Sequence, residues 1–149
     1  MGSSRKEIYF DNSATTRVFD SVRDIMTETM TADYGNTSSL HTKGVEAEQY
    51  VREARAEIAK SLRVKEKEII FTSGGTESNN LAILGTALAN RRSGNHIITS
   101  CIEHASVYNT TAFLEEQGFR VTYLPVEHGG EVSPEGLRAA VCDDTILVS

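Results

Sequence analysis

Apolar positions recur along the chain with two different periods. Spacings of three and four residues predict helices, and short apolar runs bounded by turn-forming residues predict strands. The predicted helices cover residues 18–30, 44–62, 77–90 and 105–116, with a further short helix that begins at Pro134. The predicted strands cover residues 8–10, 68–72, 96–100, 119–124 and 144–149.

Two of these helices have apolar stripes that we expect to be buried. The stripe of the 44–62 helix is Ala47, Val51, Ala54, Ile58 and Leu62, and that of the 77–90 helix is Leu81, Leu84 and Leu88. From residue 68 onward, strands alternate with helices, which is the pattern of βαβ units. The sequence therefore predicts an α/β fold with a mainly parallel sheet and flanking helices.

The last predicted strand ends in Thr145–Ser149, a mostly apolar run. Such strands are normally buried on both faces of an α/β sheet, and a domain seldom stops there without a covering helix. The length of 149 residues is compatible with a single domain, but this final strand favours a different interpretation. We expect the chain to be the front part of a longer protein.

Composition and charge narrow the possible functions. The chain has 15 basic and 21 acidic residues, a net charge of −6, and no basic block that would suggest a nucleic-acid partner. No apolar run approaches the roughly 18 residues that span a membrane, and the N-terminus does not resemble a signal peptide, so a cytoplasmic protein is expected. Cys101 and Cys142 are too few for a disulfide scaffold and too isolated for a metal site. We expect both thiols to be reduced and mostly buried.

The strongest candidate for a binding site is the turn between the second predicted strand and the helix that follows it. Gly74 and Gly75 allow the backbone to approach an anion closely, and the N–H groups and dipole of a helix N-terminus favour negative charge. The turn lacks the lysine of a Walker loop and the third glycine of a dinucleotide fingerprint. Two interpretations stay open: a phosphate-binding turn with hydroxyl donors from Thr76 and Ser78, or a tight structural turn with Thr76 as the N-cap.

A histidine, His104, follows the next predicted strand, where another helix begins. The carboxyl ends of parallel strands share one edge of a sheet, so we expect His104 on the same edge as Gly75 and Thr76. Taken alone, His104 could equally be a helix cap or a surface residue. Glu103 beside it is expected to be a solvated acid in the first helical turn.

Other polar features have simpler interpretations. The loop Gly35–His41 could contribute to a site, or it could be a loop that leads into a helix with Ser or Thr as the cap. His96 opens a predicted strand and His128 lies in a Gly-Gly turn, and we expect both to be structural.

Five segments occur in an order and spacing that resemble a known family. They are Ile8–Thr16, Gly35–His41, Phe71–Asn80, His96–His104 and Asp143–Ser149. Together they resemble the front of the pyridoxal-phosphate-dependent cysteine desulfurases, in the class V aminotransferase group, and TSGGTESNN resembles the nitrogen-fixation and iron–sulfur-cluster branch. The resemblance implies the first part of the large domain of a fold-type I pyridoxal-phosphate enzyme. Residues 1–16 would be an active-site arm of the small domain, and residues 17–149 a partial cofactor-binding domain truncated at its C-terminal end.

The resemblance also implies roles for individual residues. Gly75 and Thr76 would hold the phosphate of pyridoxal 5′-phosphate, while His104 would stack on its ring and assist proton transfers as a catalytic residue. Residues 12–15 and 36–39 would lie near the substrate side of the pocket. The implied reaction converts L-cysteine to L-alanine and leaves a persulfide that a homodimeric enzyme passes to a sulfur-acceptor or scaffold protein for iron–sulfur cluster assembly.

The sequence departs from the family pattern in two loops and lacks several of its catalytic groups. Arg17 and Thr37 stand where the family often has proline, which affects loop rigidity. The family's cofactor lysine, ring-nitrogen aspartate, carboxylate-binding arginine and sulfur-accepting cysteine have no matching motif in the 149 residues, so we expect the chain alone to be inactive. The alternatives are another class V enzyme, such as a selenocysteine lyase or an aminotransferase, and a non-catalytic anion-binding or interaction module.

Overall fold

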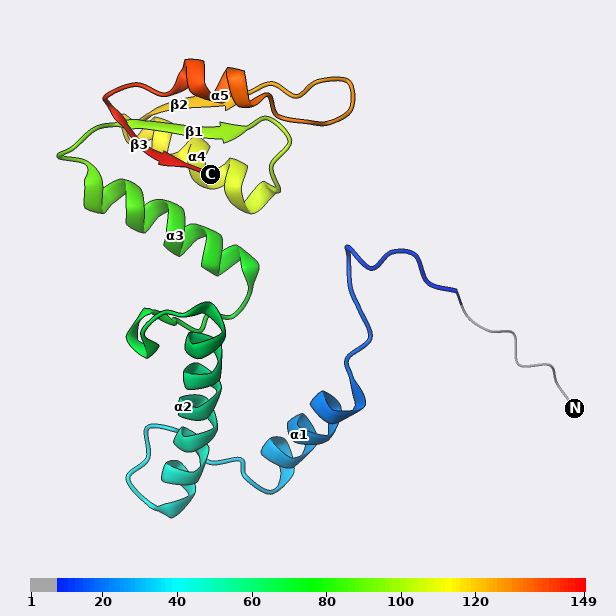
Figure 1. The fold of residues 1–149 in the computed structure, drawn as a ribbon. Helices are drawn as coiled ribbons and strands as arrows, with labels where there is room; N and C mark the ends of the chain where they lie inside the picture. The colour runs from blue at the N-terminus through cyan, green and yellow to red at the C-terminus, as the bar shows by residue number, and fades with distance from the viewer. Residues whose placement is uncertain (1–7) are drawn as a thin grey trace, which may run out of the picture. The chain divides into compact units, whose positions relative to one another are not determined.

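The structure, a computed structural model, describes residues 8–149, and these divide into two compact units. Unit 1, described over residues 8–70, is helical, and unit 2, residues 71–149, holds a β-sheet with flanking helices (Figure 1). Residues 1–7 of the predicted N-terminal segment lie outside the described residues.

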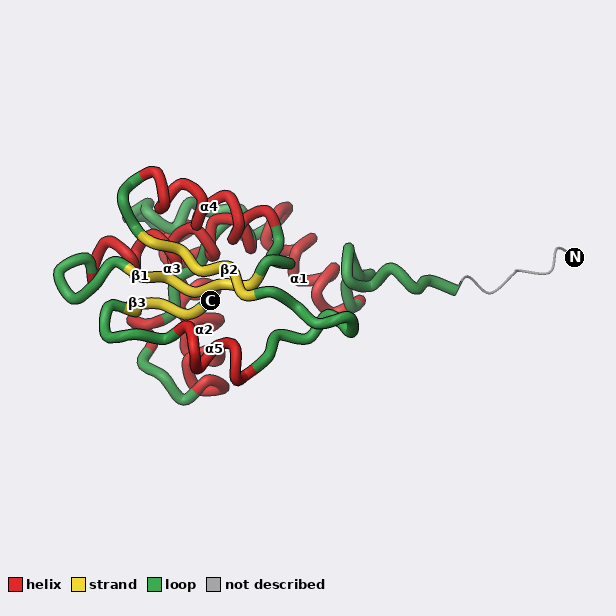
Figure 2. The backbone as a smooth tube through the Cα atoms, turned by 90° about the horizontal axis from the view of Figure 1, so that it is seen from above, coloured by secondary structure: helices red, strands yellow, loops and turns green. Residues whose placement is uncertain are grey.

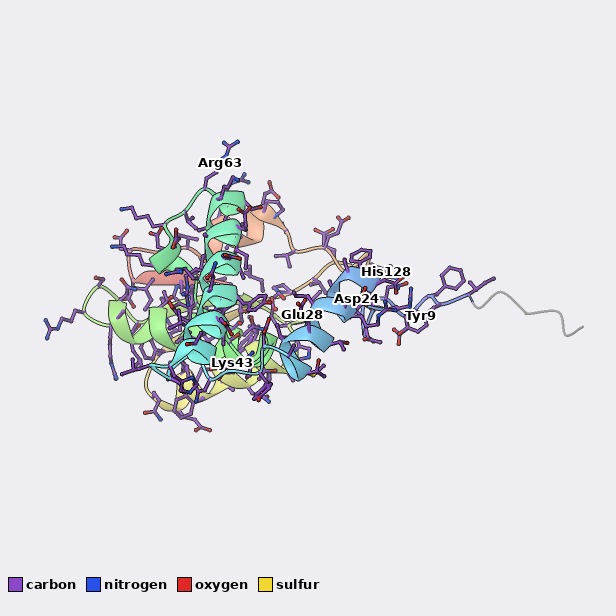
Figure 3. All side chains as sticks on the ribbon, turned by 90° about the horizontal axis from the view of Figure 1, so that it is seen from below. Tyr9, Asp24, Glu28, Lys43, Arg63 and His128 are labelled. Carbon is purple, nitrogen blue, oxygen red and sulfur yellow. The ribbon has the colours of Figure 1, made fainter. Side chains whose placement is uncertain are left out.

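Unit 1 consists of helix α1 (Asp20–Thr31), helix α2 (Thr42–Leu62) and a short 3₁₀ helix, η1 (Glu66–Glu68). Both long helices lie within two residues of their predicted bounds. Helix α2 ends at Arg63, which adopts a left-handed backbone (φ 56°) so that its N–H reaches the carbonyls of the last turn. The exposed side chain of Arg63 projects away from the end of α2 (Figure 3).

The loop between α1 and α2 lies directly against the first turn of α2. A Cβ on Gly35 would collide with the carbonyl of Lys43, and a Cβ on Gly44 would collide with the carbonyl of Ser39. Glycine is therefore required at both positions, because only a residue without a side chain permits this approach of two backbone segments.

The predicted buried stripe of α2 is mostly wrong. Ala47 is buried, but Ala54, Ile58 and Leu62 are exposed, and Val51 is half-buried. An amphipathic helix buries its apolar face only where a second layer covers it. Among the described residues no layer covers this face, and the buried positions of α2 are small: Gly44, Ala47 and Ala59.

The first two predicted strands are also wrong. Residues 8–10 and 69–72 pair with no strand of the described chain, and Glu68 belongs to η1. The backbone at Ile69 is extended (φ −93°, ψ 120°), as its β-type side chain favours. A strand, however, exists only as part of a hydrogen-bonded ladder, and these segments join no ladder of the described sheet.

Unit 2 contains the predicted parallel sheet, which confirms the α/β fold class. Its strands are β1 (His96–Ser100), β2 (Arg120–Leu124) and β3 (Thr145–Val148), all parallel and in the order β2-β1-β3 (Figure 2). Its helices are α3 (Gly75–Asn90), α4 (Ala105–Glu116) and α5 (Pro134–Ala140). Helices α3 and α4 cover one face of the sheet, and α5 lies on the other (Figures 1 and 2).

The core of unit 2 lies between the sheet and the pair α3 and α4. Ile97 of the core cluster lies in the central strand in register with Val121 and Leu147, which are partly buried and pack against the cluster. Further members of the cluster are Ile83, Ala87, Val107, Leu114 and Phe119. This burial of aliphatic and aromatic surface is the main stabilising contribution available to the unit.

The predicted buried stripe of α3 is mostly wrong, since of its three leucines only Leu84 packs against the core. Leu81 and Leu88 are about half exposed, Leu84 is half-buried, and the buried positions are Ile83 and Ala87. Helix α3 carries apolar residues on several faces, so spacings of three and four residues fit more than one stripe.

His96 is structural, as expected, but both cysteines are exposed. His96 is fully buried in the sheet, where Nδ1 hydrogen-bonds to the hydroxyl of Thr145 (2.7 Å) and Nε2 to that of Thr122 (2.8 Å). Burial lowers the pKa of His96, and the nearby charge of Arg120 lowers it further. The expectation that Cys101 and Cys142 are buried is wrong, because both lie in loops at the ends of strands.

Candidate cofactor-binding site

Helix α3 begins with an N-terminus that no side chain caps. It starts at Gly75, with Gly74 as the N-cap residue, so the prediction of Thr76 as the cap is wrong. The first N–H groups of a helix have no partner inside the helix. No described side chain accepts a hydrogen bond from Gly75 or Thr76, so their N–H groups stay available to a ligand.

The two glycines are not explained by contacts within the described chain. A Cβ added at Gly74 or Gly75 would meet no atom within 4 Å. The backbone of Gly74 is extended (φ 163°), a conformation open to any residue, and Gly75 begins the helix. The glycines therefore leave open space in front of the helix N-terminus, and this space fits a phosphate group held by N–H donors and the helix dipole.

The turn before α3 is held in place by its own side chains. The carboxylate of Glu77 accepts hydrogen bonds from the hydroxyl and the N–H of Ser73, each 2.6 Å long, and these bonds lower the pKa of Glu77. Ser78, predicted as a donor to an anion, instead shares a hydrogen bond with the hydroxyl of Thr72 (2.6 Å). This hydrogen bond links the turn to the first part of α3. The hydroxyl of Ser78 is therefore engaged, and Thr76 supplies the hydroxyl beside the open space.

His104 is the N-cap residue of α4, so the structural interpretation of this histidine is confirmed. Its Nδ1 accepts a hydrogen bond from the N–H of Ser106 (3.1 Å). Glu103 precedes the helix and is not in its first turn, and it is half-buried and accepts the hydroxyl of Ser100 (2.9 Å). A cap role does not exclude a ligand role, because the His104 residue remains exposed.

A cavity of about 310 Å³ brings two of the predicted residues together. Thr76 and His104 both line it, with Asn80, Ser106 and Phe113 among the other lining residues. Gly75 does not line this cavity, although it precedes Thr76 at the same helix end. The cavity makes the first turn of α3 and the start of α4 neighbours, although no strand of the described sheet leads into α3, so the shared-edge argument does not explain this placement.

The sequence reasoning missed the polar residues that join α3 to α4. Asn79 donates to the hydroxyl of Ser106 (2.8 Å), and Thr110 donates to the side-chain oxygen of Asn80 (2.9 Å). The available signal was the pair Asn79-Asn80 inside an apolar helix. Such residues are unfavourable in a helix interior unless their side chains find partners.

No group of three or more His, Cys, Asp or Glu side chains that could hold a metal ion is found within residues 8–149. Over the same residues, no helix is both long and apolar enough to cross a membrane.

The fold and the site define the class of protein. Residues 8–149 match the family described as aminotransferase class-V, and the chain belongs to this family. Among its relatives, the cysteine desulfurase IscS of Methanosarcina thermophila is 52% identical over 149 residues, which are 100% of this chain and 37% of that protein. The putative cysteine desulfurase IscS 1 of Bacillus subtilis is 48% identical over 97% of this chain and 38% of its own length.

The chain is also similar to parts of longer proteins whose structures have been solved. A NifS-like protein superposes with a TM-score of 0.88 at 42% identity, covering 96% of this chain and 39% of the other. The structure described as SspA in complex with cysteine has a TM-score of 0.84 at 39% identity, covering 94% of this chain and 40% of that one. The chain thus spans well under half the length of the relatives it matches.

Proposed function

We propose that this chain is the N-terminal part of a cysteine desulfurase and supplies the phosphate-binding turn of its pyridoxal 5′-phosphate site. Three lines support the proposal: membership of the class V aminotransferase family, relatives named cysteine desulfurase, and a similar structure described as a complex with cysteine. The full enzyme would convert L-cysteine to L-alanine and pass the sulfur to an acceptor or scaffold protein. It would act as a cytoplasmic homodimer.

The observation that carries the proposal is the open helix N-terminus beside His104. The N–H groups of Gly75 and Thr76 and the hydroxyl of Thr76 would hold the phosphate. His104 lines the same cavity as Thr76 and would face the ring, with Nε2 as the atom that holds or transfers a proton. When bound, pyridoxal phosphate supplies an electron sink for bonds at the amino-acid α-carbon.

The chain by itself should bind without turning over substrate. None of its five lysines lies in a motif that matches the family's cofactor lysine, and neither Cys101 nor Cys142 matches the sulfur-accepting cysteine. Sulfide released from cysteine by the purified 149-residue chain would contradict this part of the proposal.

A pair of glycine substitutions tests the phosphate role. Gly75→Ala adds a methyl group in the open space in front of the helix, whereas Gly85→Ala adds one to an equally open position in the middle of α3. Both variants should fold. The ligand is pyridoxine 5′-phosphate, which lacks the aldehyde and cannot react with surface lysines.

We expect Gly75→Ala to weaken binding by about tenfold, a free-energy change of about 1.4 kcal/mol, and Gly85→Ala to leave it unchanged. Equilibrium dialysis measures both, and pyridoxine without phosphate should show no difference between the variants. Equal affinities for the phosphate ester in the two variants, or no binding by the unmodified chain, would refute the assignment.

A further inference from the structure

The imidazole of His104 is the end of a short chain of hydrogen bonds that begins on the neighbouring helix. Asn79 of α3 donates from Nδ2 to the hydroxyl oxygen of Ser106 (2.8 Å). That hydroxyl lies 2.9 Å from Nδ1 of His104, and the N–H of Ser106 donates to the same Nδ1 at 3.1 Å. Two groups of one residue therefore converge on one ring nitrogen.

The directions of these bonds follow from the chemistry of the donors. A backbone N–H can only donate, so Nδ1 of His104 must present its lone pair. The Ser106 oxygen already accepts the amide of Asn79, which leaves its own hydrogen free to point to Nδ1. A neutral imidazole whose Nδ1 is an acceptor carries its proton on Nε2.

The two ring nitrogens of His104 have different surroundings: Nδ1 is hydrogen-bonded within the protein, and Nε2 is open to a ligand. Ser106 is 7% exposed and Asn79 is half-buried, so the bonds to Nδ1 are shielded from water. The His104 residue itself is exposed, and Nε2 hydrogen-bonds to no other group in the described part of the chain. The nitrogen that a ligand can reach is therefore the one that carries the proton.

We propose that Asn79 and Ser106 are positioning residues that set His104 in the Nε2–H tautomer and fix the plane of its ring. The functional role of this tautomer rests on the proposed function. In the proposed site, a ring held in this way reaches a bound cofactor or substrate only through Nε2. Nδ1 is then excluded from proton transfer. The inference about the tautomer itself needs no ligand.

Nitrogen NMR of the 15N-histidine-labelled chain without any ligand tests the tautomer directly. At about pH 8.5, where an ordinary imidazole is neutral, we expect Nδ1 of His104 to show the shift of an unprotonated nitrogen and Nε2 that of a protonated one. Ser106→Ala removes the hydroxyl but keeps the backbone N–H donor, so both shifts should move part of the way toward the tautomer mixture of free imidazole. Ser106→Thr, which keeps the hydroxyl, should restore them.

The matched control is Ser100→Ala. Ser100 is also a buried serine with a hydroxyl bond, but its partner is Glu103 and not His104. This variant should leave the His104 shifts unchanged. If Ser106→Ala fails to fold, Asn79→Ala is the second variant. It removes the amide that donates to Ser106, and it should change the Nδ1 shift of His104 in the same direction.

Two results would overturn the inference: a proton on Nδ1 in the unmodified chain, or shifts that stay the same when Ser106 or Asn79 is replaced. Neither result depends on phosphate binding, so this inference and the proposed function fail separately.

Discussion

The two units differ in how much of their apolar surface they bury. Unit 2 encloses a core in which Ile97 and Leu114 are fully buried. In the described part of unit 1 only Gly44, Ala47 and Ala59 are buried, while Leu40 is fully exposed and Phe10 is 93% exposed. A parallel sheet with helices on both faces closes a core within the unit, whereas two helices joined by a loop do not.

In unit 1, local backbone and polar contacts hold the loop before α2 in place of an apolar core. In unit 1 the loop before α2 is held by the glycine contacts and by polar bonds, among them the phenol of Tyr50 donating to the carboxylate of Asp33 (2.7 Å). Lys43 adds an ion pair to Asp33 at 3.5 Å. Such bonds order a segment but contribute less than apolar burial, and exposed ion pairs contribute least. The candidate site lies in the unit that has a core.

The largest expected effect is a core truncation in unit 2. Leu114→Ala should lower the free energy of unfolding of unit 2 by about 2 to 5 kcal/mol, because a fully buried leucine loses its contacts and leaves a cavity. Hydrogen exchange of the β1 amides measures the change. Leu40→Ala, at a fully exposed leucine of unit 1, is the matched control and should alter stability by no more than about 0.5 kcal/mol.

The same experiment can break the comparison between the units. We expect the α2 amides to keep their exchange rates in Leu114→Ala, because the buried residues of α2 belong to unit 1. An equal loss of protection in α2 and β1 would mean that the two units share one cooperative core.

A smaller effect concerns the acid dependence of unit 1. The hydrogen bond from Tyr50 is the main reason that the pKa of Asp33 lies below its ordinary value of 3.8, and the same bond raises the pKa of Tyr50 to about 12. Because the folded pKa of Asp33 is lowered, its contribution to stability is full above pH 3.8 and is lost as the pH falls through the folded value.

Tyr50→Phe should therefore raise the pKa of Asp33 toward its ordinary value and weaken this acid dependence. Carbon NMR of the Asp33 carboxyl group measures the titration. Tyr34→Phe is the control, since the ring of Tyr34 lies beside Lys43 and would be retained. An unchanged Asp33 titration in Tyr50→Phe would show that the hydrogen bond does not hold the carboxylate.

The parts of the fold that the sequence predicts well are those in which local pattern and tertiary partner agree. β1 and α4 have the predicted bounds, because each is a regular apolar element covered within unit 2. The 68–72 strand failed since extended propensity at Ile69 cannot supply a pairing partner. The α3 stripe failed because periodicity does not choose among several apolar faces of one helix.

The site shows the same limit at the level of single residues. Thr76 and His104 line one cavity as expected, but the expectation relied on a strand at residues 68–72 that is absent from the described sheet. The predicted cap of α3 was wrong because a hydroxyl next to a glycine indicates a cap in sequence, whereas the helix begins two residues earlier than predicted, at Gly75. The bond between Asn79 and Ser106 joins residues 27 positions apart, and no local pattern reports such a pair.

The central claim is that a phosphate ester binds at the N-terminus of α3 in unit 2. Amide chemical-shift mapping of the whole chain during titration with pyridoxine 5′-phosphate tests it most directly. We predict that the largest shifts occur at Gly75 and Thr76, with further shifts near His104 and none along α1 and α2. Shifts that leave Gly75 and Thr76 unchanged, or that are largest in unit 1, would contradict the claim.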